Sequence, residues 1–181
     1  MKLRWHNKDI ARLQINDKSL HPFIFQTGSL TRYIQQQCKG TFHIDIKSEA
    51  WRYPMPDEVR LLKMRTREHA FIRESWLKCD NQPMVYARTV IPRKTLKGKC
   101  KELTRLGTKP LGEILFADKT TYRSVMRYAM IPAQCELYNQ ASKPVERNTG
   151  FWGRQSLFYI KNKPLLIIEV FLPSIKECIQ S

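Results

Sequence analysis

Runs of apolar residues separated by turn residues predict a sheet of about six strands. From Phe42 to Ile46 every second residue is apolar, which is the period of a half-buried strand. Five more runs are rich in branched and aromatic side chains and end at turn residues. The six expected strands cover residues 41–51, 68–79, 84–91, 120–131, 153–161 and 165–172. Neighbouring strands in sequence usually pair antiparallel, so we expect an antiparallel sheet.

Two turns and a weakly patterned lead-in complete the expected chain path. Asp80–Pro83 predicts a four-residue hairpin loop, and Asn162-Lys163 predicts the turn of a closing hairpin. Residues 1–28 show little periodicity, which indicates a variable, partly helical lead-in. With 181 residues, 42% of them hydrophobic, the chain has the size and apolar content of one domain. We therefore expect a single domain over residues 1–181.

Apolar residues spaced by three and four predict helices beside the sheet. Ser29 can cap a helix that runs toward Gly40, and a second helix is expected over residues 96–106. Pro110 can open a third helical turn that carries Leu111. Because these helices fall before the sheet and in its middle, the expected class is α+β, with helices on one face of the sheet.

The last predicted strand contains a carboxylate in an apolar run. Residues 164–173 read PLLIIEVFLP, and Ile167 and Phe171 share the strand face of Glu169. A carboxylate in such a place becomes protonated, pairs with a cation or lines a cavity, and raised pKa values of this origin cluster at functional sites. The alternatives are a solvent-facing edge position or a structural ion pair with an arginine.

Arg73 is a candidate cation for the same pocket. It lies between apolar residues on one face of its strand, where its planar guanidinium can offer two donors to a carboxylate. From the pattern alone, a solvated arginine or an ion pair with Glu74 or Glu49 is the favoured explanation of the residue. The sequence pattern alone does not select Arg73 over Arg88 or Arg127.

The charge balance raises the question of nucleic-acid binding. Lys and Arg number 32 against 16 Asp and Glu, a formal net charge of +16, which is typical of nucleic-acid-binding proteins. The basic residues are nevertheless spread along the chain, without a basic tail or a helix-turn-helix pattern. We therefore expect no specific nucleic-acid binding, and a positive field that attracts small multivalent anions.

Cysteine usage and hydropathy bear on compartment and metal binding. The five cysteines are odd in number and widely spaced, which indicates reduced, mostly structural thiols. The four histidines are equally scattered, so no metal site is expected. No stretch resembles a secretory signal or a membrane span, and we expect a soluble, cytoplasmic protein. The cysteines are Cys38, Cys79, Cys100, Cys135 and Cys178.

Four segments together resemble the chorismate pyruvate-lyase family. They stand in the family's order and near its spacing, within residues 29–173, whereas the lead-in and the tail match poorly. The resemblance implies a lyase that converts chorismate to 4-hydroxybenzoate and pyruvate, the first step of ubiquinone biosynthesis. It also implies helical flaps over a buried site. The segments are Ala87–Pro92, Leu106–Gly112 with Leu115-Phe116, Phe151–Arg154 and Lys163–Pro173.

The resemblance implies four ligand contacts. The family's site arginine falls on Arg73, which would hold the ring carboxylate of chorismate together with the backbone NH of Leu30. The family's site glutamate falls on Glu169, which would hold the oxygen of the future phenol together with the backbone NH of Leu111. Position 30 is often methionine in the family, and a backbone contact tolerates the leucine found here. The scheme needs no cofactor and no metal, and we expect a monomer.

The alternative is a non-catalytic domain that senses aromatic acids. Effector domains of some bacterial transcription regulators resemble the same fold. Such proteins usually carry a helix-turn-helix region ahead of the sensor, and residues 1–28 are too short to supply one. The lyase is therefore the leading hypothesis.

Overall fold

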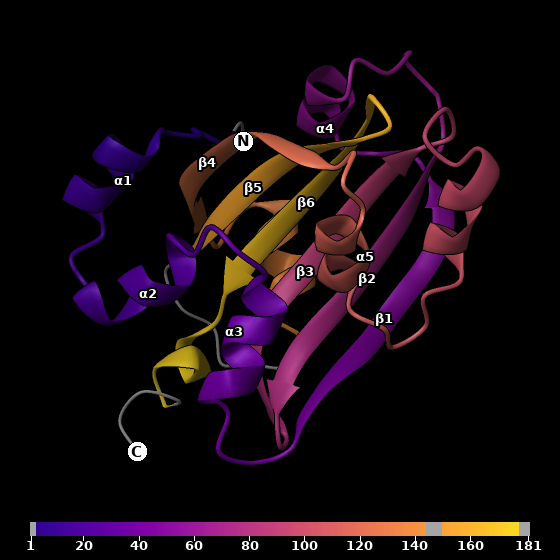
Figure 1. Cartoon of the computed structure of the whole chain (residues 1–181). Coiled ribbons are helices and arrows are strands. Elements are labelled where there is room, and N and C mark those ends of the chain that lie inside the picture. The colour runs from indigo at the N-terminus through magenta and orange to yellow at the C-terminus, as the bar shows by residue number, and fades with distance from the viewer. Residues whose placement is uncertain (1–2, 144–149, 178–181) are drawn as a thin grey trace.

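A six-stranded sheet forms the centre of the molecule in the computed structural model, which describes residues 3–143 and 150–177. All neighbouring strands pair antiparallel, in the order β1-β2-β3-β6-β5-β4 (Figure 1). The α+β class and the six-stranded antiparallel sheet are thus confirmed. The strands are β1 (Phe42–Arg52), β2 (Ala70–Cys79), β3 (Gln82–Pro92), β4 (Tyr122–Pro132), β5 (Gly150–Ile160) and β6 (Lys163–Phe171).

Short helices connect and cover these strands. Ser29 caps α3 as predicted, since its side chain accepts a hydrogen bond from the amide of Arg32. Residues 98–104 of the second predicted helix form a 3-10 helix, and no described helix is long and apolar enough to cross a membrane. The helices are α1 (Lys8–Gln14), η1 (Lys18–Leu20), α2 (His21–Ile24), α3 (Leu30–Gln37), α4 (Pro56–Leu61), η2 (Gly98–Thr104), α5 (Leu111–Ala117), α6 (Glu136–Ala141) and η3 (Pro173–Lys176).

The helices are divided unequally between the two faces of the sheet. On one face, α1, α2 and α3 pack on side chains such as Leu77 and Phe171, and η2 and α5 pack beside them on Phe158. On the opposite face, α6 and the end of α4 pack against Ile72 and Ile168. The expected helical layer therefore covers one face, and two small helices that the sequence did not place on the second face cover the other.

A buried ion-pair network fastens the strands on this second face. Arg88 donates from Nε to Glu58 at 2.7 Å and from Nη1 to Glu74 at 3.1 Å. Burial alone raises the pKa of Glu74, but hydrogen bonds from Arg52 and Tyr86 outweigh burial and lower that pKa to about 2. Arg88 is therefore part of the scaffold, on the opposite side of the sheet from α3 and α5.

The hairpin between β2 and β3 is tighter than predicted. Its turn contains only Asp80 and Asn81, because β3 already begins at Gln82. Asp80 has a φ of 50°, a left-handed conformation that aspartate tolerates better than most residues. The four-residue loop is wrong, and the pairing of the two strands is confirmed.

The closing hairpin turns one residue earlier than predicted. Lys161 and Asn162 have φ values of 49° and 60°, which matches the positive φ that a two-residue type I′ turn requires at both positions. The resulting register pairs Arg154 with Glu169 across β5 and β6. A turn at positions 162 and 163 would instead have placed Glu169 opposite Ser156.

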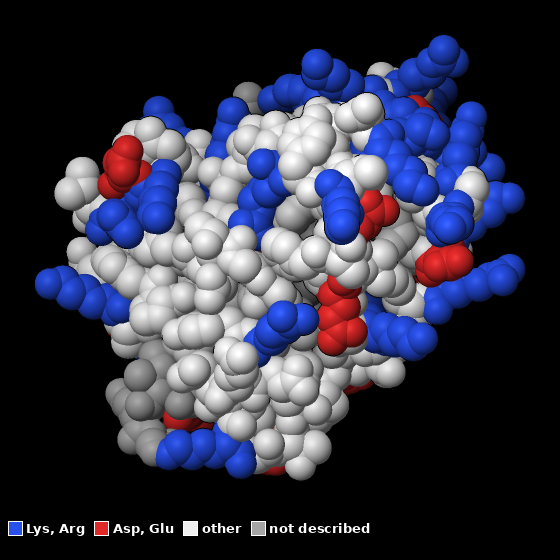
Figure 2. All heavy atoms as spheres, viewed as in Figure 1, with Lys and Arg blue, Asp and Glu red and all other residues white. Residues whose placement is uncertain are grey.

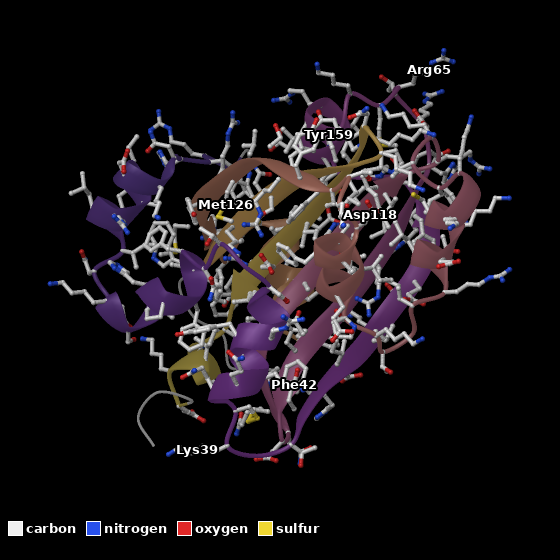
Figure 3. All side chains as sticks on the ribbon, viewed as in Figure 1. Lys39, Phe42, Arg65, Asp118, Met126 and Tyr159 are labelled. Carbon is white, nitrogen blue, oxygen red and sulfur yellow. A yellow bond between two sulfur atoms is a disulfide. The ribbon has the colours of Figure 1, made fainter. Side chains whose placement is uncertain are left out.

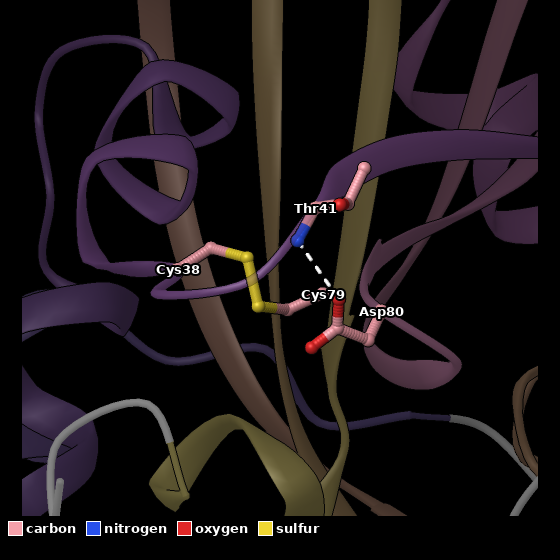
Figure 4. Close-up of a disulfide and its surroundings, with 4 residues drawn as sticks. All are labelled: Cys38, Thr41, Cys79 and Asp80. Carbon is pink, nitrogen blue, oxygen red and sulfur yellow. Dashed lines mark hydrogen bonds between the residues drawn. A yellow bond between two sulfur atoms is a disulfide. The ribbon is translucent and has the colours of Figure 1, made fainter.

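A disulfide joins Cys38 at the end of α3 to Cys79 at the end of β2 (Figure 4). Their Cα atoms are 5.7 Å apart, within the usual range, and beside them the Thr41 amide donates to Asp80 at 2.8 Å. The expectation of reduced thiols is wrong for this pair, because the fold brings together cysteines 41 positions apart. Cys100 and Cys135 are free and buried, and Cys178 lies outside the described residues.

Reduction of this disulfide is expected to destabilise the protein by about 2–4 kcal/mol, because cutting a loop of this length restores chain entropy to the unfolded state. The measurement is the free energy of unfolding in urea with and without dithiothreitol. The double variant Cys38→Ser/Cys79→Ser is the control. Its free energy of unfolding should equal that of the reduced protein and should not change when dithiothreitol is added. Equal stability of the oxidised and reduced wild type would refute a stabilising bond.

Candidate active site

The strand register places the candidate side chains on one face of the sheet. Arg73 pairs with Thr89, and Ala87 pairs with Glu169, and directly paired residues project to the same face. Strand β3 lies between β2 and β6, so the backbones carrying Arg73 and Glu169 are about 10 Å apart. The small side chain of Ala87 leaves the space between them open, which suits one six-membered ring held at both ends.

Helices α3 and α5 cover this part of the sheet (Figures 1 and 3). Between the helices and the sheet lies a cavity of about 50 Å³. Its lining includes all four residues predicted for the site: Leu30, Arg73, Leu111 and Glu169. A Cβ added to Gly112 would lie 3.0 Å from the Ser29 hydroxyl, so the two helices nearly touch at their N-terminal ends.

The cavity is smaller than typical ligand pockets, which measure about 300–1,000 Å³. Hollows of about 440 and 560 Å³ lie around α4. Their arginines among the described residues are Arg60, which pairs with Asp57, and the exposed Arg67, and neither comes from the sheet. We therefore place the site at the small cavity between α3 and α5. Because the cavity is this small, binding of a six-membered ring is expected to require movement of the two covering helices, as for flaps over a site.

Arg73 lines the cavity, and two nitrogens of its guanidinium already donate to protein acceptors. Its side chain is 5% exposed, its Nε donates to Glu49 at 3.0 Å, and its Nη2 donates to the carbonyl of Gly107 at 2.8 Å. Burial lowers the pKa of Arg73, and Glu49 opposes that effect. The ion pair with Glu49 considered above is therefore present. Among the described residues Nη1 has no acceptor, so one nitrogen remains for a ligand.

Glu169 faces the same cavity and is paired with Arg154. Its Oε2 accepts from the Arg154 Nε at 2.5 Å, and the two side chains are 13% and 1% exposed. Arg154 also donates from Nη1 to the carbonyl of Gln26 at 2.6 Å, which ties the lead-in to the sheet. The structural ion pair raised as an alternative is thus present, within a cavity lining and not at an exposed edge.

The two backbone amides begin the two covering helices. Leu30 is the first residue of α3 and Leu111 the first residue of α5, and both side chains are buried. Within the described ranges neither amide donates a hydrogen bond to a protein group. First-turn amides have no partner inside their helix, so both remain able to donate to a bound ligand.

Comparison with known proteins fits this geometry. A family model described as "Chorismate lyase" matches residues 2–178. The chain belongs to this family.

Relatives that cover nearly the whole chain bear the same family name. A protein of Methylococcus capsulatus named "Probable chorismate pyruvate-lyase" is 37% identical over 157 residues, which cover 86% of this chain and 96% of the relative. A protein of that name from Nitrosomonas europaea is 31% identical over 176 residues, covering 97% of this chain and 96% of the relative. The resemblance drawn from the four sequence segments is confirmed.

Solved structures with a similar fold include effector domains of transcription regulators. The effector domain of PhnF from Mycobacterium smegmatis has a TM-score of 0.54 at 12% identity. The match covers 82% of this chain and 91% of the effector-domain chain. A GntR-family regulator from Bacillus cereus has a TM-score of 0.55 at 9% identity. The match covers 74% of this chain and 92% of the regulator chain. At such identities the likeness shows a shared fold and nothing further.

Two arginines of this chorismate lyase family member were missed by the sequence reasoning. Arg154 belongs to the FWGR segment that carried the resemblance, but neither the apolar pattern nor the resemblance gave it a role. Arg123 lines the cavity from β4, where no local pattern distinguishes it from Arg127. Arg127 is exposed, and Arg88 lies on the opposite face, so neither belongs to the site.

Many Lys and Arg side chains gather at one end of the face of the molecule seen in Figure 2. Figure 2 shows Lys and Arg side chains crowded around α4 and the segment that carries η2. No group of three or more potential metal ligands occurs in the described part of the chain. Exposed basic residues of this end include Lys63, Arg65, Arg67, Arg93, Lys94, Lys97, Lys99, Lys101 and Arg105.

Proposed function

We propose that this protein converts chorismate to 4-hydroxybenzoate and pyruvate, the first step of ubiquinone biosynthesis. The observation that supports the proposal most is the placement of Arg73 and Glu169 at the two sides of one small cavity beneath α3 and α5. Family membership supports the same reaction. The proposal describes a monomer that acts without a cofactor.

The reaction needs orientation more than strong activation. The ether bond between C3 of the ring and the enolpyruvyl oxygen breaks, and the hydrogen on C4 leaves as a proton. The electrons of the C4–H bond complete the aromatic ring, and the departing enolpyruvate takes up a proton to become pyruvate. The gain of aromaticity drives the step, so fixed charges and exclusion of water are the main contributions expected of the protein.

Each site residue has a defined role in this proposal. The free nitrogen of Arg73 and the NH of Leu30 hold the ring carboxylate, and Glu169 and the NH of Leu111 hold the C4 oxygen. Because Arg154 pairs with Glu169 as a carboxylate, Glu169 accepts a hydrogen bond from the C4 hydroxyl or receives the C4 proton. The positive end of the surface favours encounter with a dianionic substrate.

The deciding experiment incubates the purified protein with chorismate. Chromatography identifies the aromatic product, and lactate dehydrogenase with NADH measures pyruvate; a sample without protein corrects for spontaneous decay. We expect equal amounts of 4-hydroxybenzoate and pyruvate. A different aromatic isomer would refute the assignment. Tight binding of aromatic acids without turnover would instead favour the sensing domain, which the fold of the effector domains allows.

A further inference from the structure

Arg123 is a cation without a carboxylate partner at the edge of the cavity. Its Nη1 donates to the carbonyl of Thr27 at 2.6 Å, and its guanidinium lies 4.7 Å from the ring centroid of Phe158. Its Nε is buried and has no hydrogen-bond partner. No Asp or Glu of the described residues lies within ion-pair distance of it. A buried, unpaired donor on a charged group is costly unless a ligand completes it.

The charges around the cavity leave a place for one more anion. Arg73 is paired with Glu49 and Arg154 with Glu169, whereas Arg123 adds a third guanidinium with no counterpart. Burial lowers the pKa of Arg123 and the charge of Arg154 lowers it further, while the charge of Glu169 opposes both effects. A ligand carboxylate beside Arg123 would relieve both effects.

Arg123 also stands on the opposite side of Glu169 from Arg73. The strand order places β4 two strands beyond β6, whereas β2 lies two strands to the other side. A ring held by Arg73 at one end and Glu169 at the other therefore cannot bring the same carboxylate to Arg123. Only a substituent that extends past Glu169 toward β4 can reach it.

We propose that Arg123 binds the carboxylate of the enolpyruvyl group and so makes the site selective for a dicarboxylate substrate over its monocarboxylate product. The inference rests on the proposed function, because in chorismate this carboxylate is joined through an ether to C3, next to the C4 oxygen held by Glu169. Pyruvate carries it away after cleavage. The contact therefore holds the substrate and the leaving group but not 4-hydroxybenzoate.

The competing role for Arg123 is a purely structural one. Thr27 lies two residues before the cap of α3, so the hydrogen bond from Arg123 also fastens this flap to the sheet. A residue that only holds α3 against the sheet affects the affinity for every bound ligand equally. A carboxylate-binding residue affects only ligands that carry the second carboxylate, and this difference separates the two roles.

The test compares two stable ligands by calorimetry. One is 4-hydroxybenzoate, and the other is its 3-(carboxymethoxy) derivative, which places a second carboxylate on an ether at the position of the enolpyruvyl group. In Arg123→Gln we expect the affinity for the dicarboxylate to fall about 10- to 100-fold, the usual worth of a hydrogen bond to a charged group. We expect the affinity for 4-hydroxybenzoate to change less than about twofold.

Turnover is the second measurement of the test. We expect kcat/KM for chorismate to fall by a similar factor in Arg123→Gln and by a smaller factor in Arg123→Lys. Arg127 is exposed on the same strand, so Arg127→Gln should change neither the ligand affinities nor kcat/KM. Equal losses for both ligands, or no loss for either, would overturn the inference. If the wild type binds both ligands but does not cleave chorismate, the proposed function fails while the binding comparison still decides the role of Arg123.

Discussion

Glu169→Gln is expected to lower kcat about 100- to 10,000-fold, the range for loss of a positioned proton acceptor. Glutamine keeps the size and one oxygen of the side chain but removes the charge that pairs with Arg154. The change also leaves Arg154 buried without a counterion, which should cost about 3–5 kcal/mol of folding stability. Initial rates at saturating chorismate measure the first effect, and thermal unfolding measures the second.

The control must separate lost chemistry from lost stability. The double variant Glu169→Gln/Arg154→Gln removes the stranded charge, so it should regain part of the melting temperature without regaining activity. Glu113→Gln on the exposed side of α5 should behave like the wild type. If Glu169→Gln kept near-normal kcat while folded, Glu169 would have no role in the reaction.

Arg73→Ala is expected to lower kcat/KM for chorismate by about 100-fold or more, because a charge-assisted contact to the ring carboxylate is lost in a water-poor site. The product retains this carboxylate, so the affinity for 4-hydroxybenzoate should fall as well. That result contrasts with Arg123→Gln, in which only the dicarboxylate is affected. Steady-state kinetics and calorimetry on the same preparation give both values.

Arg73→Lys tests whether geometry or charge matters. Lysine preserves the charge but cannot reach Glu49, the Gly107 carbonyl and a ligand with one rigid group, so we expect an intermediate loss. Arg127→Ala, at an exposed position of β4, serves as the matched arginine control. Unchanged product affinity in Arg73→Ala would contradict the carboxylate contact.

The sheet and the flaps were predictable from local patterns. Alternation of apolar residues predicted β1, Ser29 predicted the start of α3, and Pro110 predicted the start of α5. These features depend on residues adjacent in sequence, where periodicity and capping leave clear signals. The 3-10 geometry of η2 has no comparable signal, and α6 was missed altogether.

The partners of the site residues were not predictable in the same way. The apolar run singled out Glu169, whereas Arg73 was selected only by the family resemblance, and apolar surroundings left the ion pairs of both open. The pairing of Arg154 with Glu169 depends on a single-residue choice of turn, since moving the turn by one position gives Glu169 a partner two residues further along β5. Pairing Cys38 with Cys79 required the docking of a helix against a distant hairpin, which no local pattern records.

The link between Cys38 and Cys79 limits how α3 can move. One end of the helix is bonded covalently to the rim of the sheet, while Leu30 at its other end lies over the cavity. The helix can therefore swing about Cys38 but cannot lift away as a unit. Opening of the site then requires α3 to rotate about its bonded end. The range of this rotation depends on whether Cys38 and Cys79 are oxidised, although neither residue lines the cavity.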